Sequence, residues 1–328
     1  MTPNAHSLSI VIERSPLVRR RIERVLGAAT GLERVAAVEH PDEAEPLLAT
    51  KPSLIACDAQ DARRVLGWLA ERLPFSHLLV WSTSSSADLA RLALAQPRFS
   101  HVIGWPGFAS MPRAWEVAMV ARRLLDPRAK SPSLRDLLGW GATVVEWQPR
   151  TSADRDRAVS GIRELSLHAG CPPRLAERVA EAAHELLMNA MYDAPHDSRG
   201  QPRYAHDRRQ DLVLEPHEVP TLRLATDGMQ LALQASDPFG TLQRGHLFEG
   251  VARGLEGASA DSTPIPSAIL DTSRGGAGLG MLKLLAASAV LMADVDHGRR
   301  TEVSVFWELD TSPRELRSMP KSIHFFER

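Results

Sequence analysis

The chain has 328 residues, enough for two domains of ordinary size. Hydrophobic residues make up 44% of it and charged residues 24%, which is typical of globular proteins and excludes a disordered, collagen-like or mucin-like chain. Lys and Arg number 39 against 40 Asp and Glu, and the formal net charge is -1. This balance gives the chain as a whole no attraction to nucleic acid or to an acidic membrane.

The two cysteines, Cys57 and Cys171, are far apart in the sequence and match neither a disulfide framework nor a metal-binding cluster. The first residues lack a basic start followed by a long apolar run. No apolar run in the chain approaches the roughly 18 residues that a membrane span requires. We therefore expect a cytoplasmic protein that binds neither membranes nor nucleic acid.

Short apolar runs alternate with helical patterns in the first half of the chain. The helical pattern is clearest in residues 15–29, where Val18, Ile22 and Leu26 recur at the spacing of one helix face. Five such alternations predict a doubly wound, five-stranded parallel sheet, in which function is expected at the carboxyl ends of the strands. The expected strands cover residues 8–13, 33–40, 52–58, 76–82 and 100–105.

Polar residues at those strand ends give a first resemblance. Residues 7–127, which we assign to a first domain over 1–127, resemble a response-regulator receiver domain, because Asp58 ends the third strand where that family carries its phosphoacceptor aspartate. The residues that stand at the other functional positions of the family are Glu13, Arg14, Ser82 and Trp105.

Two of these residues depart from the family. Arg14 stands where the receiver has a second acid, and Trp105 stands where it has a lysine before a proline. Phosphoryl transfer to Asp58 requires a divalent cation on carboxylate oxygens, whereas Arg14 supplies a fixed cation that we expect to pair with Asp58. The first domain is thus predicted to be a pseudo-receiver used for docking. The alternatives are residual phosphorylation, or an Asp58 that only caps the next helix.

The second half begins after a proline-containing linker over residues 128–138 and ends before a polar tail over 311–328. Residues 241–274 between its elements are rich in Gly and Pro and predict a long loop. The expected elements are a strand in 141–149, helices in 154–170 and 171–194, strand pairs in 221–240 and 290–309, and a helix that opens at the glycine cluster before Met281.

Four motifs follow one another in this half. On the second helix, Glu181, Glu185 and Asn189 repeat at a spacing of four residues, and ELLMNA is followed by SDPFG, GGAGLGM and RTEVSV. In this order they resemble the ATP-binding domain shared by gyrase, heat-shock chaperones, histidine kinases and mismatch-repair ATPases, the GHKL superfamily. The resemblance covers roughly residues 140–310, assigned here to a domain over 139–310, and implies an α/β sandwich.

The resemblance assigns a role to each motif. Asn189 would hold Mg²⁺, Glu185 would act as the base, Asp237 would accept from the adenine amino group and Thr301 would support the adenine pocket. The loop over 241–275 would be the ATP lid. The first glycine box departs from the family because Phe239 and Thr241 occupy its glycine positions, with Gly240 between them. The glycines expected to bind the cofactor are Gly240, Gly276, Gly278 and Gly280.

The residues that precede the ATP-binding domain narrow the subfamily. A histidine kinase requires a phosphoacceptor histidine on a helical hairpin directly before this domain, and the chain has no room for one, so a self-phosphorylating histidine kinase is not expected. The strand and helix found there resemble those of anti-sigma-factor serine kinases. The prediction is a bacterial signalling regulator in which a pseudo-receiver is coupled to an ATP- and Mg²⁺-dependent serine/threonine kinase.

The predicted partner of this kinase is a protein: a sigma factor, an anti-sigma antagonist or another signalling protein. The sequence leaves a homodimer open. The alternative function is a non-catalytic module in which ATP only changes the surface offered to a protein partner.

Overall fold

The computed structural model describes residues 8–31, 34–83, 87–106, 109, 111–126, 129–197, 199–260 and 277–328. The chain divides into two compact units. The first comprises Met1–Ser131 and Met319–Ile323, and the second comprises Pro132–Ser318 and His324–Arg328. No helix within the described ranges is both long enough and apolar enough to cross a membrane.

The first unit is built on parallel strands in the order β2-β1-β3-β4-β5. This is one of the two common orders of doubly wound sheets, and the predicted alternation of strands and helices is confirmed. Every residue of the β1 strand is buried, as expected of a parallel strand covered on both faces. The strands are β1 (Leu8–Ile12), β2 (Arg34–Val38), β3 (Leu54–Asp58), β4 (His77–Ser82) and β5 (His101–Gly104).

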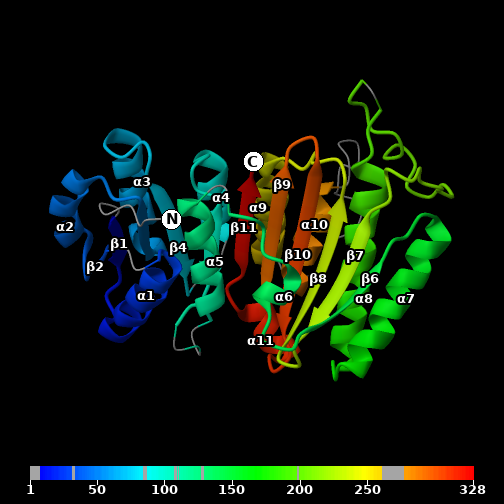
Figure 1. The fold of residues 1–328 in the computed structure, drawn as a ribbon, viewed down its shortest axis with the longest axis horizontal. Coiled ribbons are helices and arrows are strands. Elements are labelled where there is room, and N and C mark those ends of the chain that lie inside the picture. Colours follow the sequence, from blue (N-terminus) through cyan, green and yellow to red (C-terminus); the bar gives the residue numbers. More distant parts are fainter. Residues whose placement is uncertain are drawn as a thin grey trace. The chain divides into compact units, whose positions relative to one another are not determined.

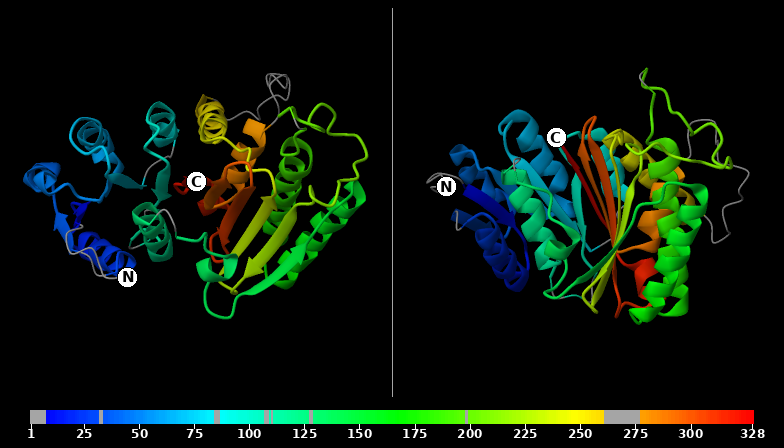
Figure 2. Two further views of the ribbon diagram at one scale, coloured as in Figure 1. Left: turned by 45° about the horizontal axis from the view of Figure 1, so that its top comes forward. Right: turned by 45° about the vertical axis from the view of Figure 1, so that its right-hand side comes forward.

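Helices cover both faces of this sheet, with α1 and α5 on one side and α3 and α4 on the other (Figure 2). The α1 helix starts at a proline in its first turn and buries Val18, Ile22 and Leu26, the face that the sequence predicts. The helical elements are α1 (Pro16–Ala29), α2 (Pro41–Ala44), the 3-10 helices η1 (Glu45–Thr50) and η2 (Ala59–Asp61), α3 (Ala62–Glu71), α4 (Ala87–Ala95) and α5 (Ala114–Leu125).

The second unit contains antiparallel strands in the order β9-β10-β8-β7-β6, drawn from orange to green in Figure 1. Both predicted strand pairs are hairpins, and each turn contains a glycine at positive φ, Gly228 in one and Gly298 in the other. The strands are β6 (Thr143–Trp147), β7 (Thr221–Thr226), β8 (Gln230–Asp237), β9 (Val290–Asp296) and β10 (Arg300–Glu308).

The helices α7, α8 and α10 lie on one face of this second sheet (Figure 2). The apolar side of α8 buries Val179, Ala183 and Leu187 at helical spacing. The helical elements of the unit are α6 (Leu134–Leu137), α7 (Ser152–His168), α8 (Pro173–Met188), the π-helix η3 (Asn189–Asp193), α9 (Arg244–Ala260), α10 (Ala277–Ala287) and α11 (Pro313–Ser318).

Three segments differ from the sequence predictions. The expected linker contains α6, which buries Leu134 and Leu137. The expected loop over 241–274 begins with the helix α9, and the rest of it, from residue 261, lies outside the described residues. The expected polar tail over 311–328 contains α11 and the strand β11 (Ser322–Glu327).

The tail prediction is wrong because three apolar residues near the C-terminus outweigh the charges that precede them. Ile323, Phe325 and Phe326 are all buried. In the second unit, the backbone N–H of Arg328 donates to the carbonyl of Val295 on β9 over 3.0 Å. The end of the chain is therefore folded against a strand of this unit.

Candidate functional site

Three of the predicted site residues line one cavity of about 270 Å³ in the second unit. Asn189 comes from the end of the α8 helix, Asp237 ends β8 and Thr301 lies near the start of β10. The β8–β10 register places Thr301 directly opposite Asp237. Asn189 and Thr301, which are more than a hundred positions apart in the sequence, thus face the same cavity.

Asn189 lies where α8 changes into a π-helix. The N–H of Ala194 donates to the Asn189 carbonyl over 2.9 Å, five residues back rather than four. Single π-helical turns of this kind are frequent at functional sites. The oxygen and the nitrogen of the Asn189 side-chain amide are both buried, and neither has a hydrogen-bond partner among the described residues. A buried amide with no protein partner indicates a site for a polar ligand.

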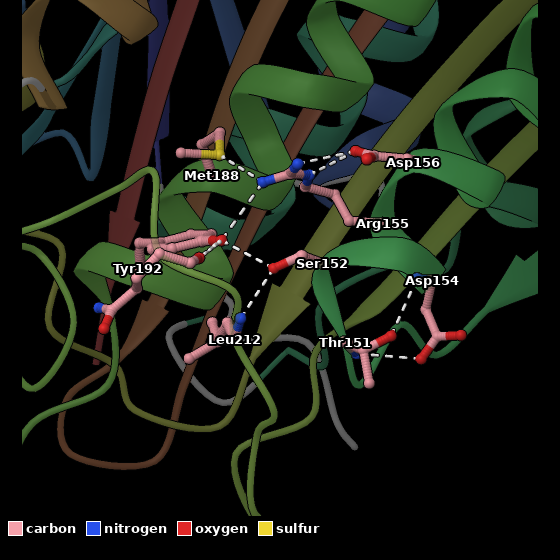
Figure 3. Close-up of polar contacts among 9 residues, drawn as sticks. Thr151, Ser152, Asp154, Arg155, Asp156, Met188, Tyr192 and Leu212 are labelled. Atoms are coloured by element: carbon pink, nitrogen blue, oxygen red, sulfur yellow. Dashed lines mark hydrogen bonds and ion pairs between the residues drawn. The ribbon is translucent and has the colours of Figure 1, made fainter.

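A polar network around Tyr192 holds this π-helix in place (Figure 3). The Tyr192 hydroxyl donates to the Gln210 carbonyl and lies 3.1 Å from the hydroxyl of Ser152 at the start of α7. Ser152 accepts from the N–H of Leu212, and because Tyr192 gives its own proton to Gln210, Ser152 is the donor in its contact with Tyr192. Arg155 of the same helix lies over the Tyr192 ring. The π-helix that carries Asn189 is thereby fixed to α7 and to the 210–212 segment.

Asp237 is a buried carboxyl group in the same cavity. Burial raises its pKa from 3.8 to about 6, although the backbone N–H of Phe239 donates to it over 3.0 Å and favours the ionised form. The buried hydroxyl of Thr301 lies opposite this carboxyl and also favours its ionised form. The cavity therefore offers an acceptor, an amide and a hydroxyl to a ligand.

Three titratable residues outside the predicted set also line the cavity: Asp193, His196 and His246. His196 is fixed by a contact of 2.6 Å between its Nδ1 and the Ala194 carbonyl, and Asp193 forms an ion pair with Arg208. His196 and Arg208 belong to the segment between η3 and β7, which carries none of the four motifs. No sequence signal pointed to these two residues, which follow Asn189 by seven and nineteen positions.

Glu185 lies one helical turn before Asn189 but faces a different space, a groove of about 780 Å³ between α7, α8 and α10. Its Oε1 is 2.5 Å from the Nζ of Lys283 on α10. Glu181 lines the same groove, so the predicted row of Glu181, Glu185 and Asn189 divides between the groove and the cavity.

The glycines predicted to bind the cofactor differ in their surroundings. A Cβ on Gly280 would lie 3.0 Å from Oε2 of Glu185 and 3.6 Å from Nδ2 of Asn189, so α10 approaches α8 closely at this residue. Gly278 belongs to α10, and Gly276 lies outside the described residues.

Gly240, which the sequence predicts to contact the cofactor, lies against the backbone of Asp296. Its φ is +65°, and a Cβ there would lie 2.1 Å from the carbonyl oxygen of Asp296. The close approach is thus to the β9–β10 turn, and Gly240 does not line the cavity. Glycine is required here because two backbone segments pack closely. From the sequence alone, this role cannot be distinguished from close packing against a nucleotide.

The predicted pairing of Arg14 with Asp58 in the first unit is wrong. Arg14 instead forms a bidentate ion pair with Asp61, with distances of 2.7 and 3.0 Å. Asp58 accepts from the N–H of Gln60 and caps η2, the alternative that the sequence left open. Partial burial raises the pKa of Asp58, whereas pairing with Arg14 would have lowered it.

The remaining receiver positions have protein partners of their own. Glu13 is buried and accepts from the N–H of Ser15 with one oxygen and from the indole of Trp81 with the other, over 2.8 and 2.9 Å. Ser82 is buried at the end of β4, and its carbonyl accepts from the N–H of Trp105. Both oxygens of the one retained acid after β1 are therefore already used within the protein.

No family model matches this chain, and no curated protein matches it. Among solved structures, a chain of the SiaB–SiaC complex from Pseudomonas aeruginosa is similar to it, with 12% sequence identity and a TM-score of 0.30. The match covers 50% of this chain and 88% of that one. A TM-score this low carries no argument about the fold or the function of the chain.

The contacts of Arg14 predict that the first unit does not bind Mg²⁺ in the receiver manner. Adding millimolar Mg²⁺, alone or with beryllium fluoride, should leave the tryptophan fluorescence unchanged, although Trp81 touches Glu13. The matched variant Arg14→Asp replaces the fixed cation by a carboxylate and should gain a response to Mg²⁺. A saturable response in the wild-type protein that disappears in Asp58→Ala would contradict the prediction.

The burial of Asp237 predicts a stability that depends on pH. Because its pKa is raised from 3.8 to about 6 in the folded protein, its contribution is present below about pH 4 and is lost as the pH rises through 6. At about 1.36 kcal/mol per pKa unit, the loss is about 3 kcal/mol. Urea unfolding across this range should show that change between the wild type and Asp237→Asn. A difference that does not vary with pH would show that Asp237 titrates normally.

Proposed function

We propose that the second unit binds ATP together with Mg²⁺. The observation that supports this most strongly is the shared cavity, in which the Asn189 amide is buried without a partner among the described residues, Thr301 is a buried hydroxyl and Asp237 is a buried acceptor. The ATP-binding family that the motifs resemble uses these three residue types in these roles. The proposal is supported because residues of three motifs, found in the order typical of that family, line one cavity.

The residues present fit the proposed ligands. The Asn189 amide oxygen is a hard ligand of the kind that Mg²⁺ prefers, and ionised Asp237 can accept from an exocyclic amine of adenine. The absence of a side chain at Gly280 leaves room beside Asn189 and Glu185. With about 270 Å³, the cavity is near the lower end of the usual range for small-molecule sites, about 300–1,000 Å³, and suits the base more than the whole nucleotide.

We further propose that the unit is a serine/threonine protein kinase and that Glu185 takes the proton of the acceptor hydroxyl. In the balanced reaction, the hydroxyl oxygen bonds to the γ-phosphorus of ATP, the bond to the bridging oxygen breaks, and ADP leaves with that electron pair. Glu185 lies on α8 one turn from Asn189. Lys283 contacts its Oε1, and its Oε2 has no ion-pair partner in the part of the chain that the structure describes. The proton can therefore pass to Oε2 without breaking the pair.

A second candidate function is favoured by the same ion pair. If Lys283 holds Glu185 throughout, ATP binding changes only the surface offered to a protein partner, and the unit is a nucleotide-responsive binding module. Both candidates place the protein in the cytoplasm, where ATP is available. They differ in whether Glu185 has a chemical role.

For the first unit we propose a docking role in place of a phosphorylation switch. The strand order supports a receiver-like sheet, whereas the Arg14–Asp61 ion pair and the engaged oxygens of Glu13 leave no acidic pair for a metal. Whether the second unit is a kinase or a binding module, the proposed partner is a protein of the same signalling system.

ATP binding can be tested by thermal shift. With Mg-ATP at one hundred times the Kd, the protein should gain about 2.7 kcal/mol of stability. Asn189→Ala and Asp237→Ala should each remove most of this gain. Ser236→Ala is the matched control, because Ser236 precedes Asp237 on β8, lies outside the cavity and should leave the shift intact. An unchanged melting temperature of the wild type in millimolar Mg-ATP would refute nucleotide binding.

Glu185→Gln separates the kinase from the binding module. The amide keeps the size of the side chain but not its basicity, so nucleotide affinity should stay within about threefold, or roughly 0.7 kcal/mol. Transfer of radiolabelled phosphate to a co-purifying protein should fall by about 10²–10⁴. Glu164→Gln, an exposed change on α7, is the control and should have no effect. Equal transfer by the wild type and Glu185→Gln would remove Glu185 from the mechanism.

A further inference from the structure

The groove between α7, α8 and α10 is about three times larger than the nucleotide cavity, about 780 against about 270 Å³. Its apolar lining includes Val159, Leu284 and the small residues Ala286 and Ala287. This volume is within the range of about 300–1,000 Å³ that holds a small ligand, so the groove has room for a few residues of a peptide but not for a folded surface. Of the residues that the sequence singled out, Glu181 and Glu185 line this groove.

The charged residues of the groove are mostly paired with one another. Arg163 contacts Glu177, and Lys283 contacts Glu185, each over 2.5 Å. Arg178 and Glu181 have no ion-pair partner among the described residues, and Arg178 is the more buried of the two. A half-buried cation without a carboxylate is the stronger recognition element, because water screens it less than it screens an exposed charge.

The groove and the nucleotide cavity share one wall. The position of a Cβ on Gly280 lies 3.0 Å from Oε2 of Glu185 and 3.7 Å from Oδ1 of Asn189, and these two side chains line the groove and the cavity respectively. A hydroxyl in the groove can therefore reach Glu185 from the side opposite the nucleotide.

We infer that this groove binds an extended segment of the protein partner, which carries the acceptor Ser or Thr at Glu185 and an acidic residue that pairs with Arg178. The inference rests on the proposed kinase function and names the substrate that it takes. Arg178 and Glu185 are separated by two turns of α8, about 10 Å at about 1.5 Å per residue. A segment in the polyproline II conformation rises about 3.1 Å per residue and returns a side chain to the same face every three residues, so the acidic residue should lie about three positions from the hydroxyl.

Binding of synthetic peptides tests the inference without nucleotide. The probes are fluorescein-labelled, alanine-based peptides with a central Ser and with Asp, Ala or Lys about three positions before or after it. Binding to the full chain is measured by fluorescence anisotropy. Of the two Asp peptides, the one that binds more tightly should bind at least about tenfold more tightly than the peptide with Lys at the same position. Arg178→Glu should reverse this order, and Arg178→Lys should preserve it.

The control variant is Arg174→Glu, an exposed charge reversal one turn earlier on α8 and outside the groove, which should leave the order unchanged. Equal affinity for the Asp and Lys peptides, no binding of any peptide to the wild type, or the same reversal by Arg174→Glu would each overturn the inference. Because the assay contains no ATP, a failure of nucleotide binding or of phosphate transfer is recorded separately by the tests of those activities.

Discussion

The two proposed binding spaces of the second unit meet where α10 approaches α8 closely at Gly280. A side chain there would meet Oε2 of Glu185 at 3.0 Å, tighter than ordinary van der Waals contact. The same approach brings Lys283, one turn further along α10, to Glu185. It thereby separates the cavity that contains Asn189 from the groove that contains Glu185. One missing side chain thus sets the spacing of the two proposed binding spaces.

The polar groups buried in the cavity lower the stability of the folded protein. Burying a polar group without a partner costs about 1–3 kcal/mol, and the Asn189 amide has no partner among the described residues. Asp237 adds the cost of burying a carboxylate, which appears as its raised pKa. A ligand that forms hydrogen bonds with these buried groups would offset that cost. Folding stability and ligand binding are therefore expected to be linked at this site.

Periodicity and turn chemistry were sufficient to predict most elements. The five strand–helix alternations of the first unit follow from apolar runs and from patterns such as Val18, Ile22 and Leu26. The order of four motifs predicted that Asn189, Asp237 and Thr301 belong together, and they line one cavity. Their function as an ATP site stays a prediction.

Long-range contacts that involve residues outside the four motifs could not be predicted from the sequence. Arg14 lies beside Asp61 rather than Asp58 because η2 carries Asp61 back toward the end of β1, which depends on three-dimensional geometry alone. The contact of Lys283 with Glu185 and the packing of Gly240 against Asp296 are likewise set by tertiary structure. The β11 strand was missed because its three buried apolar residues follow a charged stretch that dominates the local composition.

A crystal structure of the protein with Mg²⁺ and a non-hydrolysable ATP analogue is the most direct test of the central claim. The account predicts that the adenine amino group donates to Asp237 and that Mg²⁺ is bound by the side-chain oxygen of Asn189. A nucleotide bound elsewhere on the chain, with this cavity filled only by water, would contradict it.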